Sequence, residues 1–346
     1  MYLVKIVLKI VAFFHLYISK IIWNIDSLYR RSNKNKACLA CGSTNTHETG
    51  IQISDYDYFG YYERRLWAIS FYYLIFFNFG FLKRIRFYLI SKLKQNIGKA
   101  LKINFLECNN CSSLSQNLPL NSKTSMYYEY AYRLSDIYAR KGVTKQNSKY
   151  HSISIFVDKI INDYYKDNSN LKLLDIGCAE GATLYFLNKK YKKLYGIEPS
   201  KPMINWAIQN FSKQINFLSG YYNSDSYNKN YFDCIFTYHV IEHVDNHVQF
   251  IKDISYHLKK GGLLILSTPD SQKGLKTFKN TKKIKDGYMF SCSHIKLFSQ
   301  KYLSELLIEN EFEIISKNKY INHENNFKYN KPSVENHRLI IVSKKL

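Results

Sequence analysis

Residues 171–181 read LKLLDIGCAEG, an apolar run that ends in an acidic residue and two glycines. A short apolar run followed by small residues and a helical pattern predicts a buried parallel strand that turns sharply into a helix. Gly177 and Gly181 would let the backbone approach a ligand closely, and a helix at 182–190 would direct free N–H groups toward it. The turn is therefore a candidate ligand site.

A second acidic residue supports this interpretation. The segment LYGIEPS ends an apolar run at Glu198, about 20 residues beyond the glycine turn. An acidic side chain at that place can accept hydrogen bonds from both hydroxyls of a ribose. Together the two segments predict a nucleoside cofactor.

The glycine spacing distinguishes between two classes of cofactor. Dinucleotide-binding folds use G-x-G-x-x-G, whereas this chain has Asp175, Gly177 and Gly181, with Ala179 between the glycines. The stretch resembles motif I of class I S-adenosylmethionine-dependent methyltransferases, D-x-G-x-G-x-G, with Ala179 replacing the middle glycine. Four further segments resemble that family in its usual order over about residues 150–346: GIEPS, YFDCIFTYHVIEHV, LKKGGLLILSTPD and HIKLFSQKYLSELLIENEFEI.

Strands and helices are expected to alternate through this region. The predicted strands are 171–177, 193–198, 215–219, 232–238, 262–268, 312–320 and 337–345, and the predicted helices are 151–165, 182–190, 201–212, 245–259 and 299–310. This alternation predicts an α/β fold with a parallel sheet and right-handed crossovers. The last two strands match the antiparallel hairpin that closes the seven-stranded Rossmann-like sheet of the resembling family.

The resemblance also implies roles for particular residues. The cofactor S-adenosylmethionine carries an already activated methyl group, so the protein supplies alignment and sometimes a base. The cofactor-binding residues that the resemblance implies are Asp175, Gly177, Cys178, Gly181, Glu198 and Tyr238. For adenine, Asp225 or stacking on Tyr221 or Tyr222 remain alternatives. Without a cofactor, Asp175 would serve as a carboxylate at a helix N-terminus and Glu198 as a surface charge.

Two histidines are candidate general bases. His243 follows the strand 232–238 at the carboxyl end of the sheet, where ligands of open α/β sheets bind. A histidine can take a hydroxyl proton near neutral pH as the methyl group arrives. The alternative is that Glu242 and His243 only fix the next helix. His294 is the second candidate, by analogy with the family.

Seven cysteines are present, and two of them, Cys178 and Cys234, lie in expected core segments. An odd count of this kind favours a reducing compartment, the cytosol, over a secreted disulfide framework.

The other cysteines include two C-x-x-C pairs, Cys38 with Cys41 and Cys108 with Cys111. Four thiolates can hold a structural Zn²⁺ tetrahedrally, with Zn–S distances of about 2.3 Å. The alternative is cysteines that bind no metal. The region resembles the zinc-ribbon module that precedes the methyltransferase domain in bacterial enzymes of sugar and surface-polysaccharide pathways, although the pairs lie much closer together there.

Two apolar segments suggest contact with a membrane. Residues 1–25 place Lys5, Lys9 and Lys20 in one helical stripe, which suits a helix in the membrane interface or one docked on the protein. Residues 66–82, LWAISFYYLIFFNFGFL, are uncharged with basic flanks that continue to residue 94. This stretch is short for a membrane span, so we expect a segment that dips into the cytoplasmic membrane face or an aromatic lid over the substrate pocket.

The sequence therefore predicts four regions. They are an amphipathic helix at 1–30, a zinc-ribbon-like module at 31–120 with an aromatic and basic insertion at 60–100, a helical linker at 121–150, and a methyltransferase domain at 151–346.

The net charge of +23 suggests a nucleic-acid or anionic-membrane partner, but codon bias that favours Lys, Asn and Tyr also explains it. The main functional hypothesis is a cytosolic, membrane-apposed methyltransferase. Its expected acceptor is a hydroxyl or other nucleophile on a sugar of a surface glycan or of its nucleotide- or lipid-linked precursor. The expected membrane contacts are residues 1–25 and 66–94.

Three alternatives remain open. The four-cysteine module and the basicity suit an RNA base methyltransferase, although the aromatic insertion makes nucleic acid a less favoured partner. Methylation of a quinone or lipid is compatible with the apolar N-terminus. A non-catalytic membrane-associated scaffold is the third alternative, since fold does not fix function.

Overall fold

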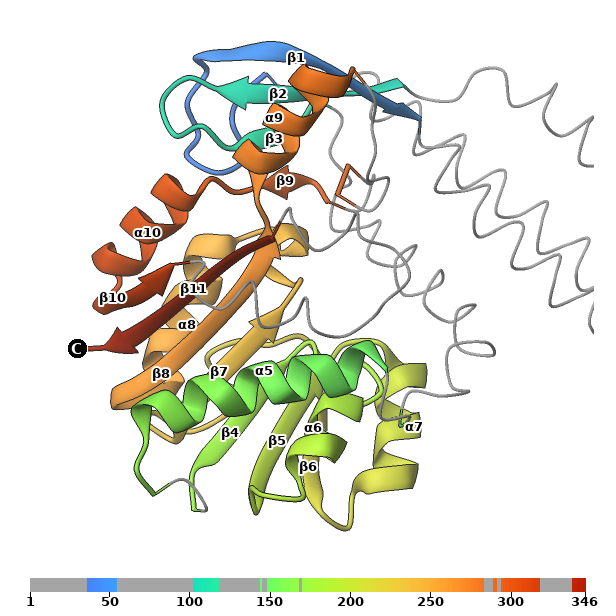
Figure 1. The fold of residues 1–346 in the computed structure, drawn as a ribbon, viewed down its shortest axis with the longest axis vertical. Helices are drawn as coiled ribbons and strands as arrows, with labels where there is room; N and C mark the ends of the chain where they lie inside the picture. The colour runs from blue at the N-terminus through green and yellow to red at the C-terminus, as the bar shows by residue number, and fades with distance from the viewer. Residues whose placement is uncertain are drawn as a thin grey trace, which may run out of the picture.

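The computed structural model describes residues 36–54, 102–117, 144, 148–167, 170–282, 289–290, 294–317 and 338–346. The described part has an α/β architecture with two sheets, of seven and four strands (Figure 1). The segments predicted at 1–30, 60–100 and 66–94 lie outside the described residues, as does nearly all of the linker predicted at 121–150.

The seven-stranded sheet has the order β10-β11-β8-β7-β4-β5-β6. Its strands are β4 (Lys172–Ile176), β5 (Lys193–Glu198), β6 (Ile215–Ser219), β7 (Phe232–Tyr238), β8 (Leu258–Pro269), β10 (Phe312–Lys317) and β11 (Arg338–Lys345). Neighbours from β6 to β8 pair in parallel, whereas β11 is antiparallel to both β8 and β10. The sequence-based prediction of a mostly parallel sheet closed by an antiparallel hairpin is confirmed.

Helices cover both faces of this sheet. Their bounds are α5 (Lys149–Tyr164), α6 (Ala182–Leu187), α7 (Lys201–Phe211), α8 (His247–His257) and α10 (Gln300–Glu309). Apolar residues of α5, α6 and α7 share one core cluster with the sheet, and those of α8 and α10 share another. Among the described residues, no helix has the length and apolar character needed to cross a membrane.

The four-stranded sheet joins segments that are far apart in the sequence. Its order is β1-β2-β3-β9, with β1 at Thr46–Ser54, β2 at Lys102–Cys108, β3 at Leu114–Gln116 and β9 at Lys296–Leu297. Helix α9 (Ser271–Thr281) lies against this sheet (Figure 1) and adds Leu275 to a core shared with Phe105, Leu114 and Leu297. The cysteine-bearing strands are therefore packed onto segments that follow β8.

The turn after β4 requires a glycine. Gly177 has a φ of +77°, in the left-handed region that glycine adopts without strain. A Cβ at this position would lie 2.5 Å from Val240 Cγ2, just beyond the end of β7. The glycine therefore allows the turn and the segment after β7 to lie in direct contact.

We predict that Gly177→Ala destabilises the fold by about 2–4 kcal/mol, because left-handed strain and overlap with Val240 add together. Gly261→Ala is the matched control, since Gly261 has the same φ of +77° but its Cβ would meet its nearest neighbour, Lys344 Cε, at 3.6 Å. It should cost about 1–2 kcal/mol. Urea unfolding without added ligand measures both values, and equal losses would contradict the assigned contact.

Candidate active site

The carboxyl ends of β4, β7 and β8 lie side by side at the centre of the larger sheet. Ile176 is opposite Thr237, and Tyr238 is opposite Ser267. The strand order reverses direction at β4, which has β5 on one side and β7 on the other. A crevice at such a point is where open α/β sheets bind their ligands.

Glu198, at the end of β5, contacts the glycine turn. Its Oε2 accepts a hydrogen bond from the Ala179 N–H at 3.1 Å, and its Oε1 accepts one from the Ser200 N–H at 2.9 Å. Burial raises the pKa of Glu198 to about 7 against the effect of these hydrogen bonds. The Ser200 hydroxyl is buried and has no hydrogen-bond partner in the described part of the chain. A carboxylate and an unsatisfied hydroxyl at this end of β5 fit the hydroxyls of a ribose.

Asp175 and Cys178 lie in and just after β4. Asp175 is buried, and desolvation together with the charge of Glu198 raises its pKa. The side chain of Cys178 packs into the core against Gly196 and Leu184. Any contact of Cys178 with a cofactor would therefore come from its backbone, as at Gly177 and Gly181.

The segment after β6 carries the three residues considered as adenine-binding candidates, Tyr221, Tyr222 and Asp225. Tyr222 Oη lies 2.7 Å from His257 Nδ1 and donates to the Asp253 carbonyl at 3.2 Å, so its ring belongs to the α8 side of the core. Tyr221 is 65 % exposed and Asp225 is in an exposed turn. Of the two tyrosines, Tyr222 is therefore held in the core, whereas the ring of Tyr221 is exposed.

The end of β7 leads into the short helix η2 (Ile241–His243), which is fixed by the fully buried Glu242. Glu242 Oε1 lies 2.9 Å from His239 Nδ1, and Oε2 accepts a hydrogen bond from Thr268 Oγ1 at 2.9 Å. Burial opposes ionisation of Glu242, but the hydrogen bond and charge of His239 outweigh it and lower the pKa to about 2. Glu242 is thus an ionised anchor between η2 and β8, a role consistent with the structural alternative for this residue.

The two candidate bases lie beside each other. The His243 and His294 rings are 4.8 Å apart between centroids, and ligand atoms of Glu242, His243 and His294 all lie within 4.8 Å of one another. His294 Nδ1 is 2.8 Å from the Met289 carbonyl, so Nδ1 carries the proton and Nε2 is the acceptor. Burial and the neighbouring His243 lower the pKa of His294 to about 3, which makes it a weak base. His243 stays a candidate for proton transfer.

Tyr238 lies at the end of β7, with the Arg338 guanidinium 5.1 Å from its ring centroid.

The hydrogen bond of Thr268 to Glu242 was not predicted from the sequence. The place of Thr268 at the end of β8, in the segment STPD, was the available signal, because polar side chains at the carboxyl ends of parallel strands meet at one edge.

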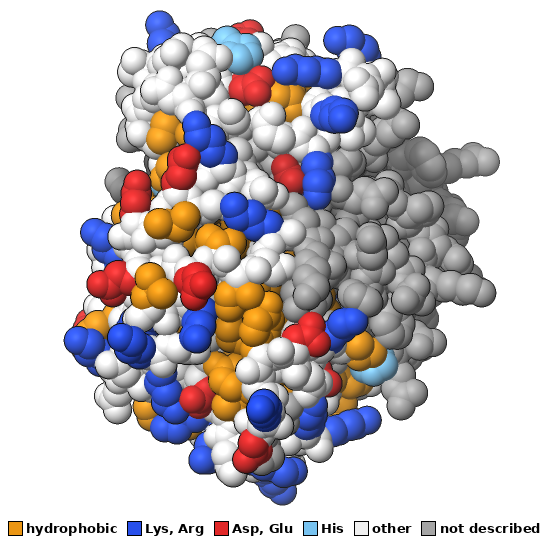
Figure 2. All heavy atoms as spheres, turned by 60° about the vertical axis from the view of Figure 1, so that its left-hand side comes forward, with side chains coloured by type: hydrophobic (Ala, Val, Ile, Leu, Met, Phe, Trp, Pro, Cys, Tyr) orange, Lys and Arg blue, Asp and Glu red, His pale blue; other side chains and the backbone are white. Residues whose placement is uncertain are grey.

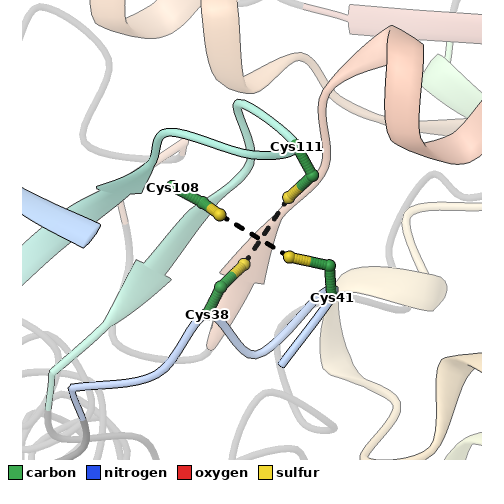
Figure 3. A group of neighbouring side chains, drawn as sticks. All are labelled: Cys38, Cys41, Cys108 and Cys111. Carbon is green, nitrogen blue, oxygen red and sulfur yellow. Dashed lines mark hydrogen bonds between the residues drawn. The ribbon is translucent and has the colours of Figure 1, made fainter. Parts of the chain in front are cut away.

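The four paired cysteines converge on one point from two turns (Figure 3). Their sulfur atoms lie within 4.8 Å of one another, with Cys38 3.6 Å from Cys111 and Cys41 3.6 Å from Cys108. A tetrahedral Zn²⁺ with Zn–S bonds of about 2.3 Å separates its sulfurs by about 3.8 Å. The arrangement therefore fits zinc without rearrangement of the backbone.

The two turns have the same hydrogen-bond pattern. The Cys38 N–H donates to the Ser43 carbonyl and the Gly42 N–H donates to the Cys38 carbonyl, each at 2.8 Å. The Cys108 N–H donates to the Ser113 carbonyl at 3.0 Å and the Ser112 N–H to the Cys108 carbonyl at 2.9 Å. The two C-x-x-C turns therefore share one backbone conformation.

One family model matches the part of the chain that contains most of the large sheet. Residues 150–317 match a family model described as a methyltransferase domain. They form a class I S-adenosylmethionine-dependent methyltransferase domain. The matched residues contain β4 to β8 and the candidate site, and the four cysteines precede them.

Curated relatives resemble part of the methyltransferase domain. A ubiquinone biosynthesis O-methyltransferase of Rickettsia canadensis is 32 % identical over 122 residues, covering 34 % of this chain and 51 % of the relative. A mitochondrial protein of that name from Dictyostelium discoideum is 30 % identical over 133 residues, covering 34 % and 41 %. The chain spans about half the length of the curated relatives it matches.

Among solved structures, a SAM-dependent methyltransferase of Thermotoga maritima is 21 % identical, with a TM-score of 0.44. The match covers 64 % of this chain and all of that one, 100 %.

The lowered pKa of His294 predicts a pH-dependent stability. The unfolded chain takes up the proton near the ordinary histidine pKa, about 6.5, whereas the folded protein resists it until about 3. Stability should therefore fall as the pH drops from about 7 toward 3. His294→Asn, which removes the titrating ring, should lose less stability between pH 7 and pH 4 than the wild type in urea unfolding. An unchanged pH dependence would contradict the burial of a neutral His294.

Proposed function

We propose that this protein is an O-methyltransferase that transfers the methyl group of S-adenosylmethionine to a ring hydroxyl of a quinone precursor. The contact of the Gly177 turn with Val240, three residues before His243 in the segment after β7, carries the proposal. The names of the relatives support the acceptor class and favour the quinone alternative over a sugar.

The chemistry of the base agrees with such an acceptor. A phenol-type hydroxyl has a pKa of about 10, as in tyrosine, so an imidazole takes its proton far more readily than that of an aliphatic sugar hydroxyl. Glu242 fixes η2 through Thr268 and so orients His243, while the neutral His294 offers Nε2 as a second acceptor.

The cofactor would be held by the turn after β4 and the end of β5. When bound, S-adenosylmethionine supplies an activated methyl on its sulfonium. Glu198 and Ser200 would accept and donate hydrogen bonds at the ribose, Asp175 would lie toward the methionine ammonium, and the backbone at 177–181 would approach the cofactor closely.

Less support exists for the other acceptors considered. The pairing of a four-cysteine module with a methyltransferase domain is the feature that favours a glycan or glycolipid precursor. For RNA, the lysines and arginines among the described residues of the face in Figure 2 are interspersed with acidic and apolar side chains. The intact Asp175, Gly177, Gly181 and Glu198 favour an enzyme over a non-catalytic scaffold.

We also propose that the four cysteines hold a structural zinc ion and that residues 1–25 and 66–94 contact the cytoplasmic membrane face from the cytosol. Such contact would bring the site to a lipid-soluble acceptor.

The acceptor is tested by transfer of labelled methyl from S-adenosylmethionine into fractions of the host lysate. Wild-type protein should label the lipid extract in a species that migrates with quinones, and Asp175→Ala should not. Label confined to glycan or to RNA would contradict the quinone proposal and identify the acceptor class. Absence of transfer into every fraction, with cofactor binding intact, would favour the scaffold.

Glu198→Gln should weaken S-adenosylmethionine binding by about 1–3 kcal/mol, because a charge-assisted hydrogen bond to the ribose is lost. Isothermal titration calorimetry measures the change. Glu313→Gln, at an exposed position on β10, is the control and should bind as the wild type does. Equal affinities of wild type and Glu198→Gln would remove Glu198 from the cofactor site.

Metal analysis tests the cysteine cluster. Purified, reduced protein should contain about one zinc ion per chain, and Cys41→Ser should lower this content and the thermal stability. A folded, reduced protein without zinc would contradict the metal assignment.

A further inference from the structure

A chain of hydrogen bonds connects the four-cysteine cluster to the loop that follows His243. Tyr302 on α10 donates from Oη to the carbonyl of Ala40, between Cys38 and Cys41, at 2.6 Å. His247 Nε2 lies 2.7 Å from the same hydroxyl. Lys296 Nζ lies 3.1 Å from His247 Nδ1 and donates to the Asp245 carbonyl at 2.8 Å.

The direction of each hydrogen bond is fixed by the groups at the two ends. A backbone carbonyl can only accept, so the Tyr302 proton points to Ala40 and its oxygen accepts from His247 Nε2. An ammonium can only donate, so Lys296 donates to His247 Nδ1. The chain therefore runs without a break from Lys296 through His247 and Tyr302 to Ala40.

The chain continues into the cysteine cluster through one peptide group. The carbonyl of Ala40 accepts from Tyr302, and this carbonyl shares a peptide group with Cys41, one of the four cysteines of the cluster. Hydrogen bonds in series polarise one another. Partners of this kind around metal ligands orient the ligands and are themselves oriented by them.

A second connection joins strand β3, which follows Cys111, to the backbone at and just after His294. Strand β3 pairs with β9, with Ser115 opposite Lys296. Gln116 donates from its backbone N–H to the Ile295 carbonyl and from Nε2 to the His294 carbonyl, each at 3.0 Å. Both candidate bases are thus attached to the cysteine-bearing strands, His294 through β3 and His243 through the loop that ends at Asp245.

The central members of the chain are buried, and the proposed reaction gives them no role. Lys296 is 2 % exposed and His247 is 5 % exposed. A buried ammonium is costly unless its donors are satisfied. The Lys296 ammonium donates to both His247 and the Asp245 carbonyl, and it therefore fixes the loop between η2 and α8.

We propose that Tyr302, His247 and Lys296 are positioning residues, which transmit the order of the metal-bound cysteine cluster to the segments that carry His243 and His294. Loss of the metal or of one link would loosen the acceptor side of the active site and leave the cofactor side, on β4 and β5, unchanged. The kinetic part of the proposal rests on the proposed methyl transfer, whereas the structural part rests only on the proposed zinc site.

Tyr302→Phe is the most selective variant, because it removes one hydroxyl and keeps the ring stacked on Phe298, with a 6.0 Å centroid distance and a 6° interplanar angle. Tyr191→Phe is the matched control, because it removes a buried hydroxyl that donates to Asp158 on α5 at 2.6 Å. Amide hydrogen exchange of the zinc-loaded full chain is the measurement. Tyr302→Phe should speed exchange about ten-fold in residues 241–251 and 294–299 and leave 172–198 unchanged.

Zinc removal tests whether the chain acts as a unit. Chelation should accelerate exchange in the same two segments of the wild type. In Tyr302→Phe it should add less than about two-fold in residues 241–251, where the link is already broken, and should keep its effect in 294–299, which β3 also holds. The proposal would be overturned if Tyr302→Phe exchanged no faster than the control. It would also be overturned if chelation and the substitution each kept its full effect on exchange in residues 241–251.

Lys296→Met provides a second variant and a kinetic readout. With the labelled acceptor fraction as substrate, Lys296→Met and Tyr302→Phe should lower kcat about ten-fold at unchanged affinity for S-adenosylmethionine, and Tyr191→Phe should not. A parallel loss of cofactor affinity would show general destabilisation and contradict the positioning role. If no acceptor is labelled, the proposed function fails and the exchange experiment still decides the positioning proposal.

Discussion

The arrangement at the carboxyl ends of the large sheet depends on the contact between the backbone of Gly177 and the side chain of Val240. This contact brings the turn after β4 against the segment after β7. Glu198 reinforces it from β5 by accepting a hydrogen bond from the Ala179 N–H. The candidate cofactor-binding residues of β4 and β5 and the segment that carries His243 therefore lie at the same edge of the sheet, as transfer of a group between two bound molecules would require.

The smaller sheet is not a separate N-terminal module, because it includes a strand from the methyltransferase domain. Its last strand, β9, comes from the segment that follows α9 and carries His294 just before it. Cys38, Cys108 and Cys111 also share a core cluster with Phe298, Leu303 and Leu306. The cysteine-bearing strands are therefore part of the scaffold around the active site, and their metal would stabilise that scaffold.

Much of the fold was predictable because buried parallel strands are short apolar runs, as in 171–177 and 232–238. The spacing within each C-x-x-C unit also allowed the prediction that the four cysteines lie together. Strand β9 could not be predicted, because its two residues show no periodicity and its partner β3 is remote in the sequence. Helix α9 was missed as well, although Asp270 caps it by accepting from the Gln272 and Lys273 N–H groups.

The sequence offers candidate site residues but not the environment of their side chains. The sequence identified His243 and His294 as candidates, yet their mutual contact and the lowered pKa of His294 arise from burial that only the packed structure specifies. The hydrogen bonds of Glu198 to the turn were likewise not apparent from spacing. The identity of the methyl acceptor is the property least predictable from the sequence, because the same fold and cofactor site serve many different acceptors.

Equilibrium dialysis of labelled S-adenosylmethionine against the full chain tests the central claim most directly. The account predicts a single saturable site from which S-adenosylhomocysteine, but not NAD, displaces the label. Absence of saturable binding, or equal displacement by NAD, would contradict a methyltransferase cofactor site at the turn after β4.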